Sequence, residues 1–171
     1  MTADTEPQKS YGVTETSSNG ERVIHPSRDD WYQVAAALLD DGWTMCSDLT
    51  AVDFSAYAPD RNLPSDVTPE RFEVVASFLS FKLRDRIRAR IQVPSDDPSI
   101  PSIYPLYPGS DFAEREVYDL FGITFDGHPD LSRIMMPETW EGHPLRKDYE
   151  TGSIPVQFKN SADAEKKNAT T

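Results

Sequence analysis

Hydrophobic and polar residues alternate along two neighbouring stretches in the middle of the chain. In the first stretch the hydrophobic positions are Phe72, Val74, Ala76 and Phe78, and in the second they are Ile87, Ala89, Ile91 and Val93. A period of two residues places these side chains on one face of a strand. The pattern therefore predicts two antiparallel strands, joined around residues 82–85, with one face buried.

A helical period follows Ser27. Its hydrophobic positions are Trp31, Val34, Ala35, Leu38 and Leu39. A period of 3.6 residues brings them to one side of a helix, which we expect to end near Gly42. Strands are expected on either side of this helix, a short one at residues 22–24 and a longer one over residues 43–54, bent around residues 47–48.

A second helix is predicted over residues 111–121. Its hydrophobic side consists of Ala113, Val117, Leu120 and Phe121. We expect Asp111 and Glu114 to form a capping box at its start. Gly122 is expected to end it in a left-handed conformation.

The other side of this helix is charged, with Arg115, Glu116 and Asp119. Arg115 and Asp119 are four residues apart, a spacing at which they can form an ion pair. Glu114 and Glu116 would project about 160° apart on the helix, so they cannot act together as acid and base on one substrate. The charged side could instead meet water, a substrate or another protein.

The remaining stretches predict loops and one more strand. Residues 57–70 and 94–108 are rich in proline, and the second of these allows at most one short helix near residues 100–107. Residues 123–125 have the composition of a short strand. These elements predict a two-layer α+β domain with a mixed or antiparallel sheet and few helices, followed by an extended C-terminal segment.

Composition divides the chain into four parts. Residues 1–20 are polar and show no period, so we expect a disordered N-terminal arm. Residues 21–125 are expected to form the core of the domain. Residues 126–150, with two Gly-His-Pro turns, are expected to extend as a segment that contacts partners. Residues 151–171 are expected to form a polar tail.

Arginines occupy polar positions of the second alternating stretch, at Arg86, Arg88 and Arg90. Such a row could follow the phosphates of RNA. However, the chain carries 17 basic and 29 acidic residues, a formal net charge of −12, and a general nucleic-acid-binding protein needs a basic surface. We therefore expect no nucleic-acid partner, and we expect these arginines to face water or acidic neighbours.

The chain has one cysteine, Cys46. It therefore contains no internal disulfide and no all-cysteine metal or iron–sulfur site of its own. We find neither a signal peptide at the start of the sequence nor an apolar run of about 20 residues. Any contact with a membrane is therefore expected to come through partners.

The two Gly-His-Pro turns place His128 and His143 among carboxylates, an arrangement that a metal site could use. The turns lack the i, i+4 spacing of a helical metal motif, and a histidine before a proline more often fixes a turn. The sequence also has no nucleophile elbow, phosphate-binding loop or dinucleotide fingerprint. Met135, Met136 and Trp140 are interpreted as core or contact residues.

Two motifs in this half of the chain are long and specific. Residues 114–131 read Glu-Arg-Glu-Val-Tyr-Asp-Leu-Phe-Gly-Ile-Thr-Phe-Asp-Gly-His-Pro-Asp-Leu, and residues 142–149 read Gly-His-Pro-Leu-Arg-Lys-Asp-Tyr. Together they closely resemble the C-type subunit of the proton-pumping NADH–quinone oxidoreductase, which forms the 30 kDa subunit family of respiratory complex I. Weaker similarity extends back through residues 49–53, so that the resemblance covers residues 22–150.

The resemblance implies a structural and assembly subunit of the peripheral arm of an enzyme that transfers electrons from NADH to quinone and couples this to proton translocation. The chain would belong to the enzyme without a catalytic, cofactor-binding or metal site of its own. NADH, FMN, iron–sulfur clusters and quinone would lie in partner subunits. The chief partners would be the D-type subunit, at the quinone site, and the neighbouring B-type subunit. The complex would place the chain on the cytoplasmic face of a bacterial cell membrane, as a peripheral subunit.

The resemblance also implies which residues contact partners or fix turns. They are Glu114, Arg115, Glu116, Asp119, His128, Arg133, His143, Arg146, Lys147 and Asp148. Two positions depart from the family pattern, because Ser132 stands where a basic residue is usual and Phe112 where tryptophan is frequent.

Two alternatives compete with this interpretation. Related membrane-bound hydrogenases and quinone dehydrogenases with other electron donors share this module, so the chain could be their equivalent subunit. It could also be a free-standing metal-dependent hydrolase that uses His128 and His143.

Overall fold

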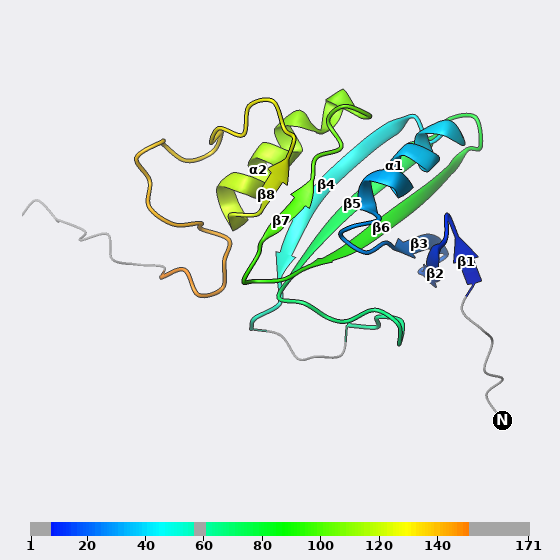
Figure 1. Cartoon of the computed structure of the whole chain (residues 1–171), viewed down its shortest axis with the longest axis horizontal. Coiled ribbons are helices and arrows are strands. Elements are labelled where there is room, and N and C mark those ends of the chain that lie inside the picture. Colours follow the sequence, from blue (N-terminus) through cyan, green and yellow to red (C-terminus); the bar gives the residue numbers. More distant parts are fainter. Residues whose placement is uncertain (1–7, 57–60, 151–171) are drawn as a thin grey trace, which may run out of the picture.

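A six-stranded sheet forms the centre of the molecule in a computed structural model that describes residues 8–56 and 61–150 (Figure 1). The strands are β1 (Gln8–Ser10), β2 (Val13–Ser18), β3 (Glu21–His25), β4 (Met45–Asp53), β5 (Phe72–Ser80) and β6 (Asp85–Val93). Their order in the sheet is β1-β2-β3-β6-β5-β4. Only the β3–β6 pair is parallel, so the sheet is mixed, as predicted.

The helices of the described residues are α1 (Trp31–Asp40), α2 (Asp111–Phe121) and a short 3₁₀ turn, η1 (Pro108–Ser110). In Figure 1, α1 lies over the sheet, and α2 lies beside β4. Two further strands, β7 (Ser99–Pro101) and β8 (Thr124–Asp126), pair in parallel as a small second sheet. This architecture confirms the α+β class with few helices. None of the described helices is long and apolar enough to cross a membrane.

The core lies between the helices and one face of the sheet. The alternating hydrophobic residues of β5 and β6 are buried on this face, as their period predicted. Trp31 of α1 contacts Phe78 of β5, with ring centroids 6.1 Å apart, and Phe78 contacts Tyr107 at 5.0 Å. Packing of such rings stabilises the two-layer arrangement.

Two of the three arginines of β6 bind acidic neighbours on the other face of the sheet. Arg88 lies 2.7 Å from a carboxylate oxygen of Glu21, and Arg90 lies 2.7 Å from one of Glu73. The expectation of acidic neighbours is therefore confirmed for these two arginines.

The prediction of a disordered arm over residues 1–20 is wrong for residues 8–18, which form β1 and β2. The turn between these strands places Tyr11 and Gly12 at φ angles of 54° and 80°. These strands are short and polar, and backbone hydrogen bonds hold them at the edge of the sheet. Since no face of theirs needs to be hydrophobic, the sequence shows no period that would predict them. Residues 1–7 and the predicted tail at residues 151–171 lie outside the described residues.

Candidate functional site

The candidate site is the greater part of the predicted contact segment 126–150, namely residues 131–150, here called the C-terminal segment. It follows β8 and returns over α2 (Figure 1). Seven of the ten residues predicted to make contacts join this segment to the domain. They are Arg115, Asp119, Arg133, His143, Arg146, Lys147 and Asp148. On the charged side of α2, Arg115 and Asp119 therefore meet the chain's own C-terminal segment.

Asp119 of α2 binds the start of this segment. Its side chain is fully buried, and one carboxylate oxygen accepts the backbone N–H groups of Ile134, Met135 and Met136 at 3.1, 2.7 and 2.8 Å. The other oxygen accepts Arg133 Nη1 at 2.8 Å. Burial raises the pKa of Asp119, but these four donors lower it more, so the net shift is downward.

The predicted ion pair between Arg115 and Asp119 is absent, and both residues bind the segment instead. Arg115 donates to the carbonyl oxygen of Ser132 at 3.1 Å and to its hydroxyl at 2.9 Å. The physical reason is that consecutive backbone N–H groups offer Asp119 more donors than one surface arginine does. Ser132, which departs from the family pattern, is thereby the partner of Arg115.

His143 and Arg146 close the C-terminal end of α2. His143 Nδ1 donates to the carbonyl oxygen of Asp119 at 2.9 Å, and Arg146 donates to those of Phe121 and Gly122. The N–H of Leu145 donates to the carbonyl oxygen of Leu120 at 3.0 Å. These donors satisfy carbonyl groups that a helix end leaves unpaired. The guanidinium cation of Arg146 also lies at the negative end of the dipole of α2.

Gly122 ends α2 with a φ of 70°, which confirms the predicted left-handed conformation. A Cβ atom at this position would lie 2.5 Å from His143 Nε2 and 2.6 Å from Arg146 Nη2. The glycine therefore serves both the turn and the close approach of the C-terminal segment.

We expect Gly122→Ala to lower the free energy of unfolding by about 2 kcal/mol, because it combines left-handed strain with displacement of His143 and Arg146. Denaturant unfolding measures the change. Gly127→Ala is the matched control, since Gly127 has a φ of +85° and open space around its Cβ position. The control should lose only about 1 kcal/mol, and equal losses would contradict the role of the close approach.

Asp53, at the end of β4, binds the other end of the segment. It is fully buried, and one of its oxygens accepts the backbone N–H of Lys147 at 2.9 Å. Arg71 lies 2.8 Å from the same carboxylate and 2.7 Å from Asp148. Burial raises the pKa of Asp53, but hydrogen bonds from Arg71, Lys147 and Ser55 lower it by more. The net shift places this pKa well below its usual range.

Glu114 points into the domain, so the predicted capping box is wrong. The N-cap residue of α2 is Ser110, not Asp111, and it makes no side-chain bond to a backbone N–H at the helix start. Glu114 is fully buried and accepts hydrogen bonds from Ser102 Oγ, Ile103 N and Ser110 Oγ at 2.6, 2.9 and 2.9 Å. This donor set occupies the carboxylate that the capping box would have used. Burial raises the pKa of Glu114, although these bonds oppose the shift.

His128 lies at the opposite end of α2 from His143. Its ring is buried, with Nε2 3.4 Å from Asp111 Oδ1, while Nδ1 accepts the N–H of Asp130 at 3.2 Å. Because the two histidines bind opposite ends of one helix, they cannot share a metal ion. Nor do residues 8–56 and 61–150 contain any group of three or more His, Cys, Asp or Glu side chains placed to hold one.

Several large side chains remain exposed around the segment. Phe112 is 67% exposed, Met135 62% and Leu145 44%. Glu116 is also exposed, on the outer side of α2. Contact with another protein, rather than burial in the core, is the interpretation that fits Met135.

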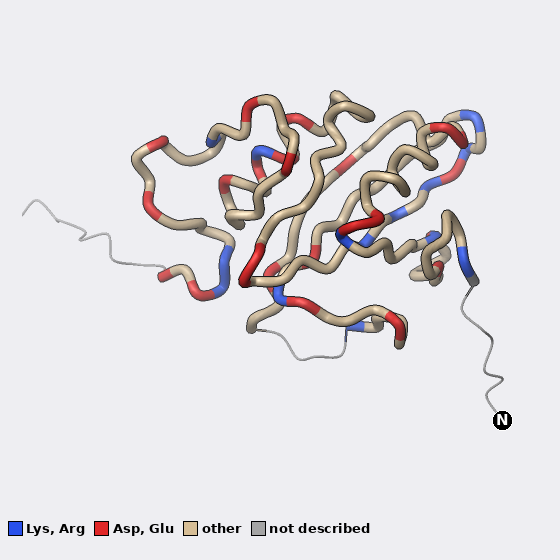
Figure 2. The backbone as a smooth tube through the Cα atoms, in the orientation of Figure 1, with Lys and Arg blue, Asp and Glu red and all other residues tan. Residues whose placement is uncertain are grey.

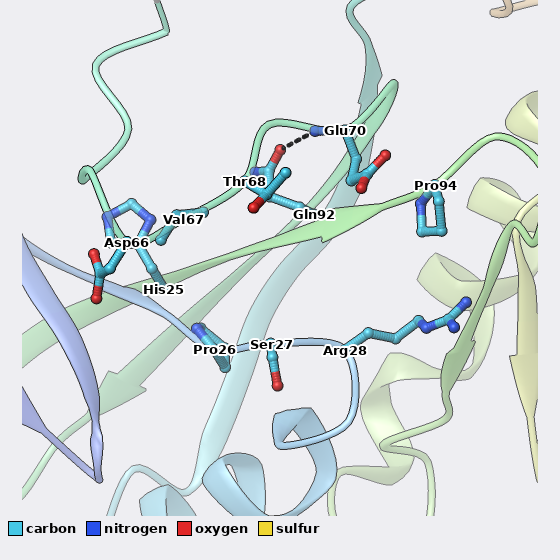
Figure 3. A pocket seen from close by; sticks show the side chains of 10 residues that line it. All are labelled: His25, Pro26, Ser27, Arg28, Asp66, Val67, Thr68, Glu70, Gln92 and Pro94. Atoms are coloured by element: carbon cyan, nitrogen blue, oxygen red, sulfur yellow. Dashed lines mark hydrogen bonds between the residues drawn. The ribbon is translucent and has the colours of Figure 1, made fainter.

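A cavity of about 310 Å³ lies elsewhere, between the loop before α1 and residues 66–70 (Figure 3). Most of the polar groups around it are bonded within the chain. Glu70 N donates to Gln92 Oε1 at 3.2 Å, Arg28 lies 2.7 Å from Asp97, and Asp66 accepts a hydrogen bond from Thr14. One group left free is His25 Nδ1, which is buried without a hydrogen-bond partner among the described residues.

His25 lines this cavity and should make stability depend on pH. Burial lowers its pKa to about 4, with the charge of Arg90 acting in the same direction. Between about pH 6.5 and 4, His25 therefore stays neutral in the folded chain but binds a proton in the unfolded chain. The free energy of unfolding falls as the pH drops through this range.

We expect this loss to reach about 3 kcal/mol at pH 4. Unfolding titrations of the parent and of His25→Gln should separate the His25 contribution from that of His143, which both proteins retain. Parallel curves for the two proteins between pH 7 and 4 would contradict the assignment.

Sequence reasoning missed four residues that position the site, namely Asp53, Arg71, Ser102 and Ser110. Only Asp53 had a signal, because it ends the weakly similar stretch at residues 49–53. The other three act through contacts that no local pattern reveals.

The sequence of the chain is similar to those of known proteins. A family model described as "Respiratory-chain NADH dehydrogenase, 30 Kd subunit" matches residues 24–154. The chain is 41% identical over 149 residues to the C-type subunit of NADH-quinone oxidoreductase from Saccharopolyspora erythraea, covering 85% of this chain and 56% of that protein. It is 43% identical over 143 residues to the protein of the same name from Nocardioides sp., covering 82% and 53%. The chain thus spans about half the length of these relatives.

Two solved structures are also similar. A trypsin-resistant fragment of Nqo5 aligns with a TM-score of 0.62 and 32% identity, over 70% of this chain and 90% of the fragment. A chain of the membrane-bound sulfane sulfur reductase, an archaeal respiratory membrane complex, aligns with a TM-score of 0.66 over 93% of this chain and 85% of its own length. At 17% identity, the second likeness shows a shared fold.

Proposed function

The chain belongs to the 30 kDa subunit family of respiratory-chain NADH dehydrogenases, and we propose that it acts as the C-type subunit of a proton-pumping NADH–quinone oxidoreductase. In this role it is a structural and assembly subunit of the peripheral arm. It supports electron transfer from NADH to quinone without a catalytic site of its own.

The observation that carries the proposal is the C-terminal segment. Buried carboxylates at Asp53 and Asp119 hold its backbone, while Met135 and Leu145 remain exposed on it. A backbone held by hydrogen bonds, with large hydrophobic side chains exposed on it, suits a protein interface, because less conformational entropy is lost on binding. The partners we propose are the D-type subunit, at the quinone site, and the neighbouring B-type subunit.

The cofactors belong, in this proposal, to the partner subunits. The single cysteine of the chain supplies at most one thiolate ligand. Iron–sulfur clusters would therefore bind elsewhere in the complex, and in this proposal NADH, FMN and quinone bind there too. The complex would hold the chain at the cytoplasmic face of the cell membrane.

Relatives at 41% and 43% identity are named as C-type subunits of NADH-quinone oxidoreductase. They favour NADH as the electron source over the alternative of a hydrogenase or another donor. The archaeal reductase shares the fold at 17% identity, which gives no comparable support for a different donor.

Affinity purification of the tagged full chain from detergent-solubilised membranes tests the proposal. We expect native mass spectrometry to find the D-type, B-type and NADH-oxidising subunits together with this chain in one complex. Recovery as a free monomer, or with hydrogenase subunits, would refute it.

A variant locates the contact surface. Met135→Asp should reduce co-purification roughly tenfold, which corresponds to about 1.4 kcal/mol, with an unchanged melting temperature. Thr50→Asp places the same charge at an exposed position of β4 and should leave assembly intact.

A further inference from the structure

Exposed hydrophobic side chains gather at a second place, the turn between β5 and β6. We define the hairpin tip as residues 80–86. Phe81 is 72% exposed and Leu83 50%, and Met45 of the neighbouring strand β4 is 44% exposed. These are three of the six large hydrophobic side chains exposed in the described parts of the chain; the others lie on α2 and the C-terminal segment. The hairpin tip lies at the opposite end of the molecule from that segment (Figure 1).

The hairpin tip also carries unpaired cations. Lys82, Arg84 and Arg86 are exposed, and none lies within ion-pair distance of a carboxylate of residues 8–56 or 61–150. Every other described arginine is used internally. Those bound to carboxylates are Arg22, Arg28, Arg71, Arg88, Arg90 and Arg133. Those bound to backbone carbonyls are Arg61, Arg115 and Arg146.

Figure 2 shows these basic residues on the turn. In a chain with a net charge of −12, three exposed cations at one turn form a local exception to the overall sign. Their charge is available to an external partner, because no ion pair with the described residues uses it.

The backbone of the hairpin tip is already ordered. Ser80 is buried, and its hydroxyl accepts the N–H of Leu83 at 3.1 Å. Arg84 adopts a φ of 54°, and Asp85 Oδ1 accepts the N–H of Arg86 at 2.8 Å. A preformed turn loses little conformational entropy when it binds.

One face of the adjoining strands extends the apolar surface of the turn. Leu79 is paired with Met45 on one side and with Arg86 on the other, and residues directly opposite each other in a sheet point to the same face. A recess of about 240 Å³ beside this row is lined by Leu79, Arg84 and Arg86, together with Gly20, Glu21 and Asp85. Hydrophobic side chains with arginine beside them are characteristic of protein interfaces.

We propose that the hairpin tip docks on an acidic surface of another protein of the same assembly. Phe81 and Leu83 enter an apolar recess of that protein, and Lys82, Arg84 and Arg86 pair with carboxylates around it. The inference rests on the proposed function, because it requires an assembly, and it adds a second contact at the far end of the chain.

The charges near the hairpin tip favour a protein over an anionic membrane. Lys82 lies over Gly42, with its Cδ 3.8 Å from the position of a Cβ there, and Asp41 precedes Gly42 in the sequence. Asp85 lies within the tip itself. A continuous layer of anionic headgroups would repel these carboxylates, whereas a protein surface can place its own charges to suit both signs.

Photo-crosslinking in the assembled complex tests the inference. Phe81 is replaced by p-benzoylphenylalanine, which keeps an aromatic side chain, and the full chain is purified with its complex after irradiation. We expect crosslinking to one partner protein, within a peptide rich in Asp and Glu, and none from the same group at Thr50. Crosslinking to lipid, or none above the Thr50 control in an assembled complex, would overturn it.

Charge reversal gives an independent measurement. Lys82→Glu with Arg84→Glu should weaken retention of the chain in the complex at least about tenfold and reduce its sensitivity to salt. The control is Lys9→Glu, which reverses an exposed cation on β1. An equal loss of retention in the double variant and in the Lys9→Glu control would contradict the docking role. A chain that enters no assembly overturns the proposed function as well, whereas an assembled chain unaffected at the tip overturns this inference alone.

Discussion

Asp119→Ala is expected to release the C-terminal segment from α2 and to lower the free energy of unfolding by about 3–5 kcal/mol. The substitution leaves three backbone N–H groups and the guanidinium of Arg133 without their acceptor. Such groups must either stay buried and unpaired or move out into water with the segment. Both outcomes remove contacts that hold residues 133–136 against the helix.

Hydrogen exchange resolves this effect along the chain. In Asp119→Ala, the amides of Ile134, Met135 and Met136 should exchange much faster, while those of β5 and β6 keep their relative protection. Glu116→Ala is the matched control, an exposed acidic residue of the same helix, and it should change stability by less than about 0.5 kcal/mol. If Asp119→Ala left those three amides protected, Asp119 would not be what binds the segment.

Asp53→Ala should have the second largest effect, a loss of about 3–4 kcal/mol. The carboxylate is fully buried and binds Arg71, Lys147 N and Ser55 N. Denaturant unfolding measures the loss, with Asp48→Ala, an exposed aspartate of the same strand, as its control. Equal losses in the two variants would show that burial of Asp53 is unimportant.

Asp53 should also make the free energy of unfolding depend on pH in the acid range. The pKa of Asp53 is lower in the folded chain than in the unfolded one, so its stabilisation is present above about pH 3.9 and is lost as the pH falls towards the folded value. Asp53→Ala should lack this part of the acid sensitivity.

The double variant tests whether the segment binds as one unit. If it detaches as a whole, loss of either carboxylate removes part of what the other one holds. Asp53→Ala with Asp119→Ala should then cost less than the sum of the single changes, by at least about 0.5 kcal/mol. Full additivity would indicate that the two ends of the segment bind independently.

The elements that local periodicity predicted are those whose side chains meet one common core. The β5–β6 hairpin and α1 follow from alternation and from a helical period, since burial of one face imposes each pattern. Gly122 was predictable because few residues other than glycine tolerate a left-handed helix end. The strands β1 and β7, of three residues each, are too short to establish any period.

The partners of the charged residues could not be predicted in the same way. A helical wheel offers Asp119 the neighbour Arg115, but its observed donors lie 14 to 17 residues further along the chain. Glu114 turned inward because Ser102, Ile103 and Ser110 surround it with donors in the folded state. Both outcomes depend on competition among groups that only the tertiary fold brings together. The resemblance implied ten contact or turn-fixing residues, but it did not reveal that seven of them join the C-terminal segment to the rest of the chain.

Attachment of the C-terminal segment through its main chain bears on how this sequence can evolve. Asp119 and Asp53 bind N–H groups of residues 134–136 and 147, and every residue type except proline supplies that group. Mutations in the outward side chains of the segment therefore leave its path unchanged while they alter the surface that a partner meets. When a partner diverges, compensating mutations can accumulate at positions such as Met135 and Glu138, whereas selection must preserve both aspartates.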